Sequence, residues 1–317
     1  MKVLVADRIS EKALNRLRRA GIEVVFQPDV VAESLWDAIV ESRADVLVVR
    51  STRVNAGALA GGRLKLVIRA GAGFNTIDVD AAGASGIYVS NCPGGNANAV
   101  VELAFGLMLA LDRHIPENVQ DLRRGKWNKL LYSDGGGLRG RTLGLIGLGT
   151  IGRKMVPVAK AFGMDVVAWS RSLTPADARD EGVAMAGTPI EVASTCDIAS
   201  VHVALNEDTR LLIGDDFFEA MKPGAMFINT ARAEVVDEDA LARAVRERGI
   251  RAGLDLFEGE PTSGTGVIHN RLFDLEGVIG THHIGGQTAE AQEAIANETV
   301  RIILEYRDKG VPPNLVA

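Results

Sequence analysis

Short apolar runs alternate along this chain with amphipathic segments, and this rhythm constrains the fold more than any other feature. A strand, a helix and a further strand in this order require crossover connections, so the strands form parallel sheets. The sequence predicts two α/β domains from two series of runs. The first series is VLVA (3–6), VVF (24–26), VLVV (46–49), LVIRAG (66–71) and IYVSN (87–91), and the second is TLGLIG (142–147), VVAWS (166–170), IASVHV (198–203), AMFINTA (225–231), AGLDLF (252–257) and VIGTHH (278–283).

The length of 317 residues suits two domains. The longest apolar run, at 99–112, contains Glu102 and is too short to span a bilayer, so it predicts a buried helix and no membrane association. A last helix is predicted at 288–309. Ligands bind at the carboxyl ends of parallel strands, so we expect the functional site in a cleft between the two domains.

Bulk composition excludes several function classes. The net charge of -6 argues against nucleic acid as the main partner. The two cysteines, Cys92 and Cys196, form no CxxC pair, so neither a zinc nor a redox motif is predicted, and no metal site is expected. The N-terminal segment MKVLVADRIS lacks the long apolar stretch of a secretory signal, so a cytoplasmic location is expected.

The TLGLIGLGTIGRKM segment contains the dinucleotide-binding pattern GxGxxG at Gly147, Gly149 and Gly152. The pattern follows an apolar strand and opens a helix, which is the context that gives it a mechanism. Its glycines allow the tight turn, the approach of backbone to a pyrophosphate and the close packing of helix on strand. The helix N-terminus offers N–H groups to the phosphates. Thr150 and Ile151 are expected to contact the cofactor as well.

Ser170 and Arg171 stand where the ribose of the cofactor is expected. About 20 residues beyond the glycine pattern a carboxylate normally accepts the ribose hydroxyls of NAD. This chain has no carboxylate at that strand end, and an arginine beside the serine suits the 2′-phosphate of NADP. NADP is therefore favoured over NAD. In the alternative interpretations, Arg171 is a solvated loop cation or stacks on adenine.

Polar groups stand at the ends of three further predicted strands. Arg232 follows AMFINTA, Asp255 lies within AGLDLF with Glu260 just beyond it, and His282 and His283 end VIGTHH. The carboxyl ends of neighbouring parallel strands meet at one edge of a sheet, so these groups should converge. Successive side chains of an extended segment point to opposite faces, so one histidine of the pair should face the site.

An arginine, a glutamate and a histidine beside a dinucleotide suit hydride transfer at a 2-hydroxy or 2-oxo acid. The forked arginine binds the substrate carboxylate and carbonyl. The histidine exchanges the hydroxyl proton. A carboxylate behind the imidazole favours its protonated form and fixes its tautomer. The sequence therefore predicts a nicotinamide-dependent oxidoreductase with a small acid as its substrate.

Nine segments between about residue 45 and residue 310 carry a resemblance to a known family. They are VRSTRV (49–54), RAGAGFNTID (69–78), NCPGGN (91–96), VELAFGLMLAL (101–111), GKW (125–127), RTLGLIGLGTIG (141–152), NTARAEVVDE (229–238), LDLFEGEP (254–261) and HHIGGQTAEA (282–291). The chain resembles the D-isomer-specific 2-hydroxyacid dehydrogenases, above all their phosphoglycerate dehydrogenase branch. The resemblance implies two Rossmann-like domains with a cleft between them: a flavodoxin-like substrate domain at 1–96 plus 286–317, and a doubly wound dinucleotide-binding domain at 97–285.

The resemblance also implies individual roles. His283 is then the acid/base, Glu260 its partner and Arg232 the residue that orients the substrate. His282, which replaces a family proline, is expected to be a bystander that shapes the loop. Other departures are Ala233 for a glycine and Ala204 for a frequent proline, which affect loop geometry. Further implied residues are Ala72 and Gly73, whose N–H groups bind the substrate carboxylate, Asp255 at the nicotinamide amide, and Thr230, Ala231 and Gly285 at the cofactor.

The substrate stays open between two classes. Arg50, Ser51 and Arg53 follow a strand in VRSTRV, a segment that contributes to phosphate binding in the phosphoglycerate branch. A substrate like 3-phosphoglycerate is therefore expected, unless these are ordinary surface arginines. The WSR segment at 169–171 is similar to glyoxylate and hydroxypyruvate reductases and favours that alternative.

Family-level expectations extend to regulation and assembly. Because the chain ends at residue 317, the resemblance implies a short form without a C-terminal regulatory domain. It implies a homodimer formed through the cofactor domain and the long helix that begins near residue 97. Some relatives are NAD(H)-sensing corepressors, so a binding protein without turnover is the alternative of another class. The lack of an extended low-complexity tail favours an enzyme.

Overall fold

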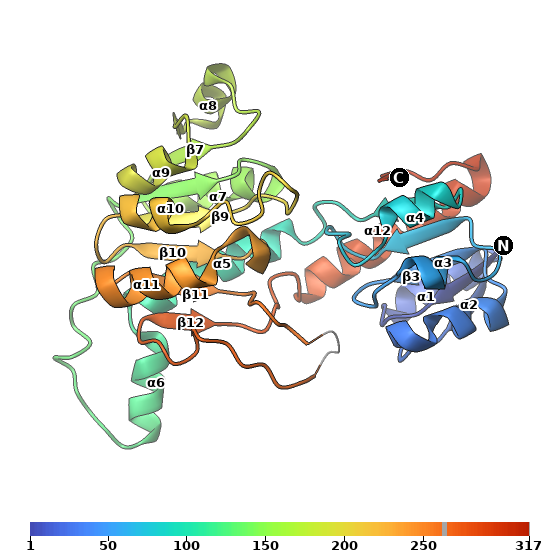
Figure 1. Cartoon of the computed structure of the whole chain (residues 1–317), viewed down its shortest axis with the longest axis horizontal. Helices are drawn as coiled ribbons and strands as arrows, with labels where there is room; N and C mark the ends of the chain where they lie inside the picture. Colours follow the sequence, from blue (N-terminus) through green and yellow to red (C-terminus); the bar gives the residue numbers. More distant parts are fainter. Residues whose placement is uncertain (262–264, 317) are drawn as a thin grey trace. The chain divides into compact units, whose positions relative to one another are not determined.

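The computed structural model describes residues 1–261 and 265–316. The chain divides into two compact units, each built around its own parallel sheet (Figure 1). The first unit consists of Met1–Asn96, Pro261–Val267 and Gly286–Ala317, and the second of Ala97–Glu260 and Ile268–Gly285. The first unit is therefore discontinuous in sequence.

The sheet of the first unit has five parallel strands in the order β2-β1-β3-β4-β5. This is the flavodoxin-like order, so the predicted topology is confirmed. The central strand β3 is buried along its whole length, as expected for a parallel sheet covered on both faces. The strands are β1 (Lys2–Val5), β2 (Glu23–Phe26), β3 (Val46–Val49), β4 (Leu66–Arg69) and β5 (Tyr88–Asn91).

Helices cover both faces of this sheet, because alternate strand residues point to opposite sides. Val3 and Val5 pack with α1 and α12, and Leu4 packs with α2, α3 and α4. The predicted helix at 288–309 is confirmed as α12, which Thr288 caps at its start and Gly310 ends with a φ of +74°. The helices are η1 (Ala32–Ser34), α1 (Glu11–Arg19), α2 (Leu35–Ser42), α3 (Ala56–Leu59), α4 (Val79–Ala84) and α12 (Ala289–Lys309).

The sheet of the second unit has seven parallel strands in the order β12-β11-β10-β9-β6-β7-β8. This is the doubly wound order of dinucleotide-binding domains with one further strand at the β12 edge, so the prediction is confirmed. The sequence did not predict β8, which has two exposed residues and no apolar run. The strands are β6 (Thr142–Ile146), β7 (Asp165–Trp169), β8 (Ala184–Met185), β9 (Ile198–Val201), β10 (Met226–Asn229), β11 (Arg251–Leu254) and β12 (Val278–Gly280).

The buried helix predicted at 99–112 is confirmed as α5, Ala97–Asp112. Among the helices of residues 1–261 and 265–316, none is both long and apolar enough to cross a membrane. The other helices of this unit are α6 (Ile115–Arg123), α7 (Thr150–Ala161), α8 (Pro175–Glu181), α9 (Pro189–Thr195), α10 (Asp215–Ala220), η2 (Ala233–Val235) and α11 (Glu238–Arg248).

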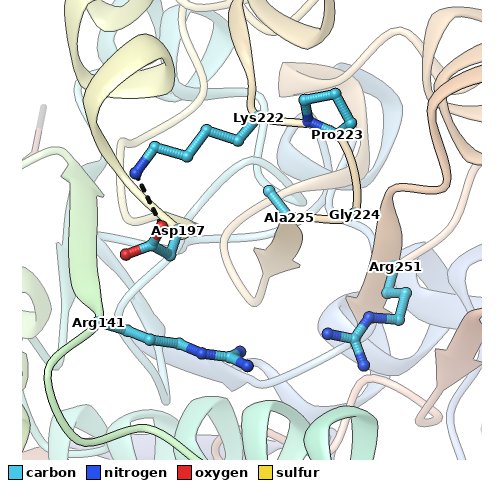
Figure 2. A pocket seen from close by; sticks show the side chains of 7 residues that line it. All are labelled: Arg141, Asp197, Lys222, Pro223, Gly224, Ala225 and Arg251. Carbon is cyan, nitrogen blue, oxygen red and sulfur yellow. Dashed lines mark hydrogen bonds and ion pairs between the residues drawn. The ribbon is translucent and has the colours of Figure 1, made fainter. Parts of the chain in front are cut away.

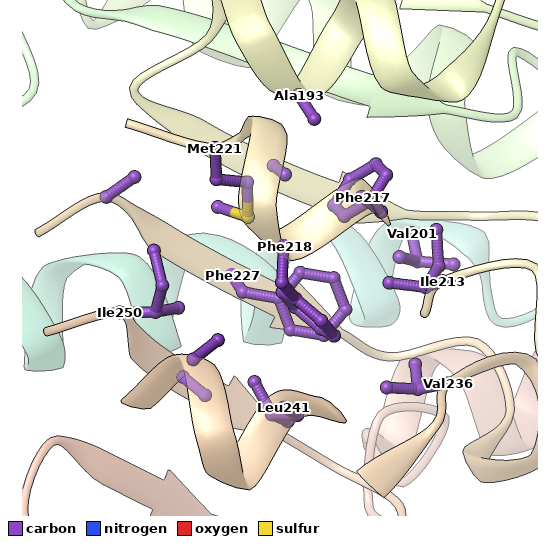
Figure 3. Close-up of a cluster of buried hydrophobic side chains, with 14 of the residues drawn as sticks. Ala193, Val201, Ile213, Phe217, Phe218, Met221, Phe227, Val236, Leu241 and Ile250 are labelled. Carbon is purple, nitrogen blue, oxygen red and sulfur yellow. The ribbon is translucent and has the colours of Figure 1, made fainter. Parts of the chain in front are cut away.

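Aromatic rings fill the core on one face of the second sheet (Figure 3). Phe217 and Phe218 of α10 pack on Phe227 of β10, and the Phe218 and Phe227 ring centroids lie 5.1 Å apart at an interplanar angle of 76°. This edge-to-face geometry is favourable for aromatic pairs. The core therefore fixes β10 and its neighbours, whose carboxyl ends carry the candidate site.

The three strands that precede the predicted catalytic groups end earlier than predicted, and one of these ends changes an argument about the histidines. β10 ends at Asn229, β11 at Leu254 and β12 at Gly280, rather than at 231, 257 and 283. His283 adopts the left-handed region with a φ of +52°, which no extended strand allows. The alternation of side chains along a strand therefore does not apply to His282 and His283, and the choice of His283 rests on the family resemblance.

Candidate active site

Three adjacent strands of the second sheet position the predicted catalytic side chains. Arg232 follows β10, Glu260 follows β11 and His283 follows β12, and these strands are neighbours in the order β12-β11-β10. The carboxyl ends of parallel neighbours lie at one edge of a sheet, which is where ligands of such sheets bind. The structure brings His283 and Glu260 into direct contact.

The His283 imidazole and the Glu260 carboxylate form a hydrogen bond. His283 Nδ1 lies 2.7 Å from Glu260 Oε2, and Glu260 Oε1 accepts the N–H of Phe257 at 3.0 Å. Each oxygen of the Glu260 carboxylate therefore makes a hydrogen bond, which fixes the orientation of the group. A carboxylate at Nδ1 selects the tautomer that carries a proton there, and this leaves Nε2 as the ring atom for exchange with a substrate.

The charge state of Glu260 follows from its surroundings. Burial alone would raise the pKa of this carboxyl. The hydrogen bond and charge of His283, the N–H of Phe257 and the charge of Arg232 outweigh burial and hold the pKa below its usual value. Glu260 is therefore a carboxylate at neutral pH, as a partner for a protonated imidazole must be.

A turn shaped by Asn229 presents Arg232. The Asn229 side chain is buried, accepts the N–H of Ala231 at 2.9 Å and donates to the Arg232 carbonyl at 2.9 Å. The Arg232 guanidinium donates to the Ala231 carbonyl at 2.6 Å. Burial lowers the pKa of Arg232, but an arginine starts so high that it stays charged. Sequence reasoning missed Asn229, although a polar residue ending a buried strand is a usable signal.

Asp255 holds the turn that carries His283. Its carboxylate is 1% exposed and accepts the Thr281 hydroxyl at 2.5 Å and the Ile284 and Gly285 N–H groups at 2.8 Å each. The predicted contact of Asp255 with a nicotinamide amide stays a prediction. His282 is exposed on the same turn.

The glycine turn after β6 fits a dinucleotide. At Gly147 the φ is +102°, and an added Cβ would lie 2.8 Å from the His202 carbonyl. At Gly152 an added Cβ would lie 2.2 Å from the Gly147 oxygen. At Gly149 an added Cβ would have no neighbouring atom within 4 Å. Gly149 is the N-cap residue of α7 and makes no side-chain hydrogen bond to the helix, so the helix N-terminus, which begins with Thr150 and Ile151, can offer N–H groups to a pyrophosphate.

Further predicted cofactor residues lie at neighbouring strand ends. Thr230 follows β10, and within the described part of the chain its buried hydroxyl oxygen has no hydrogen-bond partner. Gly285 is buried, and a Cβ there would lie 2.9 Å from Asp255 Oδ2. A buried hydroxyl that lacks a partner is the kind of group that a bound ligand satisfies. Ala231 lies between Thr230 and Arg232.

Arg171 after β7 already has an acidic partner. Its guanidinium lies 2.8 Å from Asp208, and both side chains are about three-quarters exposed, at 73% and 74%. A 2′-phosphate at Ser170 and Arg171 would have to share the guanidinium with Asp208. Sequence reasoning missed Asp208, which lies far from Arg171 along the chain.

The predicted substrate residues lie in the first unit, where Asp7 organises the segment after β3. Asp7 Oδ2 accepts the N–H groups of Arg50, Ser51 and Thr52 at 2.6, 3.2 and 3.1 Å. The Arg50 guanidinium donates to Gln287 Oε1 at 2.6 Å, and burial lowers its pKa. Asp7 directly follows the apolar run of β1, so its place at a strand end was a signal that sequence reasoning passed over.

The remaining predicted residues of the first unit lie in the same region of its sheet. Arg53 is exposed beyond Thr52. Ala72 and Gly73 follow β4, and the Ala72 carbonyl accepts the Asn91 amide at 2.6 Å. Asn91 at the end of β5 thus fixes the turn whose N–H groups are predicted to bind a carboxylate.

Comparison with known proteins identifies the family. Residues 105–285 match the model described as D-isomer specific 2-hydroxyacid dehydrogenase, NAD binding domain. The chain belongs to this family. The matched segment contains the glycine turn and Arg232, Glu260 and His283, so it covers the candidate active site of the second unit.

Named relatives within this dehydrogenase family differ in substrate. The chain is 40% identical over 310 residues to D-3-phosphoglycerate dehydrogenase of Methanocaldococcus jannaschii, covering 96% of this chain and 57% of that protein. It is 40% identical over 313 residues to hydroxypyruvate reductase of Thermotoga maritima, covering 98% and 99%. The solved structure of a glyoxylate reductase from Paecilomyes thermophila matches with a TM-score of 0.88 at 27% identity, covering 100% and 98%.

A cavity of about 220 Å³ lies at the opposite edge of the second sheet (Figure 2). Its residues precede or begin strands, and so lie away from the dehydrogenase residues at the carboxyl ends. Lys222 pairs with Asp197 at 2.7 Å, and Arg251 donates to the Leu111 carbonyl of α5 at 3.2 Å. Cations at helix C-termini are favourable without any ligand. The lining residues are Arg141, Asp197, Lys222, Pro223, Gly224, Ala225 and Arg251.

Proposed function

We propose that this chain is an NAD(P)-dependent D-2-hydroxyacid dehydrogenase that interconverts a D-2-hydroxy acid and the corresponding 2-oxo acid. The proposal assigns cofactor binding and the reacting groups Arg232, Glu260 and His283 to the second unit, and recognition of the remainder of the substrate to the first. One observation carries it: the 2.7 Å hydrogen bond between His283 Nδ1 and Glu260 Oε2, in the unit that also holds the glycine turn. An imidazole fixed from behind by a carboxylate is arranged for acid/base catalysis.

The proton in this reaction moves at His283 Nε2. In the oxidation of a hydroxy acid, Nε2 takes the hydroxyl proton while the C2 hydrogen leaves as hydride, and in reduction Nε2 returns the proton. Glu260 stabilises the resulting imidazolium through Nδ1. The nicotinamide ring, when bound, accepts or supplies the hydride.

The carboxylate and carbonyl oxygens of the substrate are assigned to Arg232. Its planar guanidinium can bind two oxygens at once, which orients the acid and polarises its carbonyl. The buried Asn229 turn supports this role, because a fixed backbone limits where the guanidinium can lie.

The proposed substrate is a 2-hydroxy acid with a second anionic group, such as 3-phosphoglycerate. Arg50 and Arg53 support this, because both follow β3 on a segment that Asp7 holds through backbone N–H groups. Glyoxylate or hydroxypyruvate is the second candidate, supported by the WSR segment at 169–171 and by the named reductases among the relatives. NADP is the proposed cofactor, on the strength of Ser170 and Arg171.

A homodimer and a cytoplasmic location complete the proposal, both resting on the family resemblance. α6 supports the dimer, because among the residues of this helix none is buried. Ile115, Val119 and Leu122 recur at helical spacing and are exposed, and α6 projects from the rest of the second unit (Figure 1). An exposed apolar helix face is characteristic of a subunit interface.

A substrate panel tests the proposed activity. Purified protein is assayed with NADH and with NADPH on glyoxylate, hydroxypyruvate, pyruvate, 2-oxoglutarate and phosphohydroxypyruvate. Turnover of phosphohydroxypyruvate with the highest kcat/KM supports the first candidate, and preference for hydroxypyruvate or glyoxylate supports the second. Tight binding of NADH without turnover of any acid would contradict the enzyme proposal and favour a corepressor-like binding protein.

A further inference from the structure

Glu238, the first residue of α11, is a buried carboxylate that the proposed proton transfer does not use. It is 4% exposed, and each of its oxygens accepts a hydrogen bond from another segment. Oε1 accepts the Glu258 N–H at 2.7 Å, and Oε2 accepts the Asn270 side-chain amide at 2.6 Å. The carboxylate thus joins α11 to the loop after β11 and to the segment around Asn270.

The loop after β11 is the one that carries Glu260. Three of its backbone N–H groups donate hydrogen bonds. That of Asp255 donates to the Asn229 carbonyl at 3.0 Å, that of Phe257 to Glu260 Oε1 at 3.0 Å, and that of Glu258 to Glu238 Oε1. The first bond belongs to the strand end and the second is internal to the loop. The hydrogen bond from the Glu258 N–H to Glu238 therefore joins the middle of this loop to α11.

A glycine next to Glu260 explains why the hydrogen bond between Glu258 and Glu238 matters for the position of Glu260. Gly259 has a φ of +79° and lies between the tied residue, Glu258, and Glu260. Glycine has the least restricted backbone of any residue, so the local chain alone does not fix the place of Glu260. Displacement of Glu260 would move the oxygen that holds His283 Nδ1.

Capping of α11 does not explain Glu238. Asp237 already caps this helix, since its side chain accepts the N–H groups of Asp239 and Ala240. Burial raises the pKa of Glu238, although the Glu258 N–H and the Asn270 amide act in the opposite direction. A buried carboxylate is costly unless its hydrogen bonds are satisfied, and here both bonds serve other segments rather than the helix.

We propose that Glu238 is a positioning residue that, with Asn270, sets the place of Glu260 and through it the orientation of the His283 imidazole. The inference rests on the proposed function, because it assigns Glu260 and His283 their catalytic roles. It adds a carboxylate outside the reacting pair that determines how well this pair is aligned.

Two substitutions of Glu238 separate positioning from simple stability. Glu238→Leu removes the acceptor and keeps the volume, so we expect kcat to fall roughly 10- to 100-fold, the scale of a misplaced catalytic group. The cofactor dissociation constant, measured by NADH fluorescence, should change less than about twofold, because the glycine turn is untouched. Glu238→Gln keeps an oxygen for the Glu258 N–H but turns an amide donor towards the Asn270 amide, so it should lower kcat several-fold, clearly less than Glu238→Leu.

Asp197→Leu is the matched control at the opposite edge of the same sheet. Asp197 also accepts a backbone N–H, that of Thr142 at 2.8 Å, and pairs with Lys222. Its loss should lower Tm and leave kcat unchanged. The inference is overturned if Glu238→Leu lowers kcat no more than Asp197→Leu does, or if Glu238→Gln and Glu238→Leu lose activity equally.

Two further measurements cover failure of folding and failure of the proposed function. If Glu238→Leu does not fold, Asn270→Ala removes the other half of the contact and should lower kcat several-fold; unchanged kcat would overturn the inference. Amide hydrogen exchange of residues 256–260 needs no activity. Faster exchange there in Glu238→Leu, with no change around Thr142, supports the inference even if the wild type turns over no acid, and unchanged exchange contradicts it.

Discussion

Asp255 Oδ2 accepts the N–H of Gly285 at 2.8 Å. The other oxygen accepts the Ile284 N–H at 2.8 Å, and the Asp255 carbonyl accepts the His283 N–H at 2.8 Å. One residue after β11 therefore supplies acceptors to three successive N–H groups beyond β12. These bonds end the strand and set the left-handed backbone at His283.

Asp255→Asn should therefore lower kcat more than it weakens cofactor binding. The amide replaces one acceptor by a donor that faces a backbone N–H, so the His283 turn loses its geometry. We expect kcat to fall at least about tenfold and the free energy of unfolding to fall by about 2 kcal/mol. Steady-state kinetics, NADH titration and chemical denaturation measure the three quantities.

Asp112→Asn is the control for that variant. Asp112 has the same exposed fraction of 1%, and its carboxylate accepts the Gly137 N–H at 3.0 Å, away from the strand ends that carry the site. It should lose stability without losing kcat. If Asp255→Asn instead raised the NADH dissociation constant more than it lowered kcat, the nicotinamide amide would be the main partner of Asp255.

His283→Ala should lower kcat roughly 100-fold or more, which is a typical contribution of an acid/base group. His282→Ala, the neighbouring control, should change kcat less than about threefold, since His282 is exposed and the Glu260 contact belongs to His283. Both variants are compared by kcat at saturating cofactor. The reverse ranking would contradict the assignment of His283.

The buried imidazole of His202 should make the folded chain less stable as the pH falls. Burial lowers its pKa to about 4, and Nε2 bonds to the Ser200 hydroxyl at 2.9 Å. The unfolded chain binds a proton at this residue below about pH 6.5 while the folded chain does not, so stability falls as pH drops from there towards 4. We expect a loss of about 2 kcal/mol from this residue, discounted because the residue is partly exposed.

Denaturation of the wild type and of His202→Asn at several pH values measures that contribution. Asparagine does not titrate, so the wild type should lose more stability than the variant between about pH 6.5 and pH 4. His114→Asn, at a histidine outside the buried core, serves as the control for replacing a histidine by asparagine. Parallel curves for wild type and His202→Asn would show that His202 is protonated in the folded chain.

Arg171 and Asp208 test the cofactor preference together. Arg171→Ala should raise the KM for NADPH more than that for NADH, because only NADPH carries the 2′-phosphate. Asp208→Asn should lower the KM for NADPH by roughly twofold to fivefold, since it frees the guanidinium from an exposed pair worth at most about 1 kcal/mol. Equal effects of Arg171→Ala on both cofactors would remove the argument for NADP.

The two parallel sheets could be predicted from patterns along the chain, whereas their strand orders were implied by the family resemblance. Alternating apolar runs and helices specify parallel strands, and the glycine turn after β6 specifies the start of the second sheet. Predicting the His283 and Glu260 pair required the family resemblance as well as their places after strands. Periodicity alone would have extended β12 through both histidines.

The residues that hold the site could not be predicted in the same way. Asp7 and Asn229 stand at the ends of apolar strands, which marks them as candidates, but no local pattern encodes which backbone N–H groups they or Glu238 bind. The early end of β12 has the same origin, because Asp255 captures the N–H groups that an extended strand would direct elsewhere. Tertiary hydrogen bonds therefore set the strand ends, and the strand ends carry the chemistry.

The exposed face of α6 predicts how subunits associate. Val119 and Leu122 lie on this face with exposed fractions of 40% and 56%, and Trp127, Leu130 and Leu131 are exposed just beyond the helix. The double substitution Val119→Glu and Leu122→Glu places two charges there, so a dimer that buries this face should dissociate to monomers. Light scattering coupled to size-exclusion chromatography measures the mass, and circular dichroism checks that the variant folds.

Ile190→Glu is the control, at an apolar residue of α9 with a similar exposure of 45%. It adds a charge to the same unit without touching α6 and should leave the mass unchanged. A wild type that is monomeric at micromolar concentration would contradict the dimer, because a stable subunit interface buries enough surface to persist there. A double variant with the same dimeric mass as the wild type would instead place the interface elsewhere, since two buried glutamates without partners would not be tolerated.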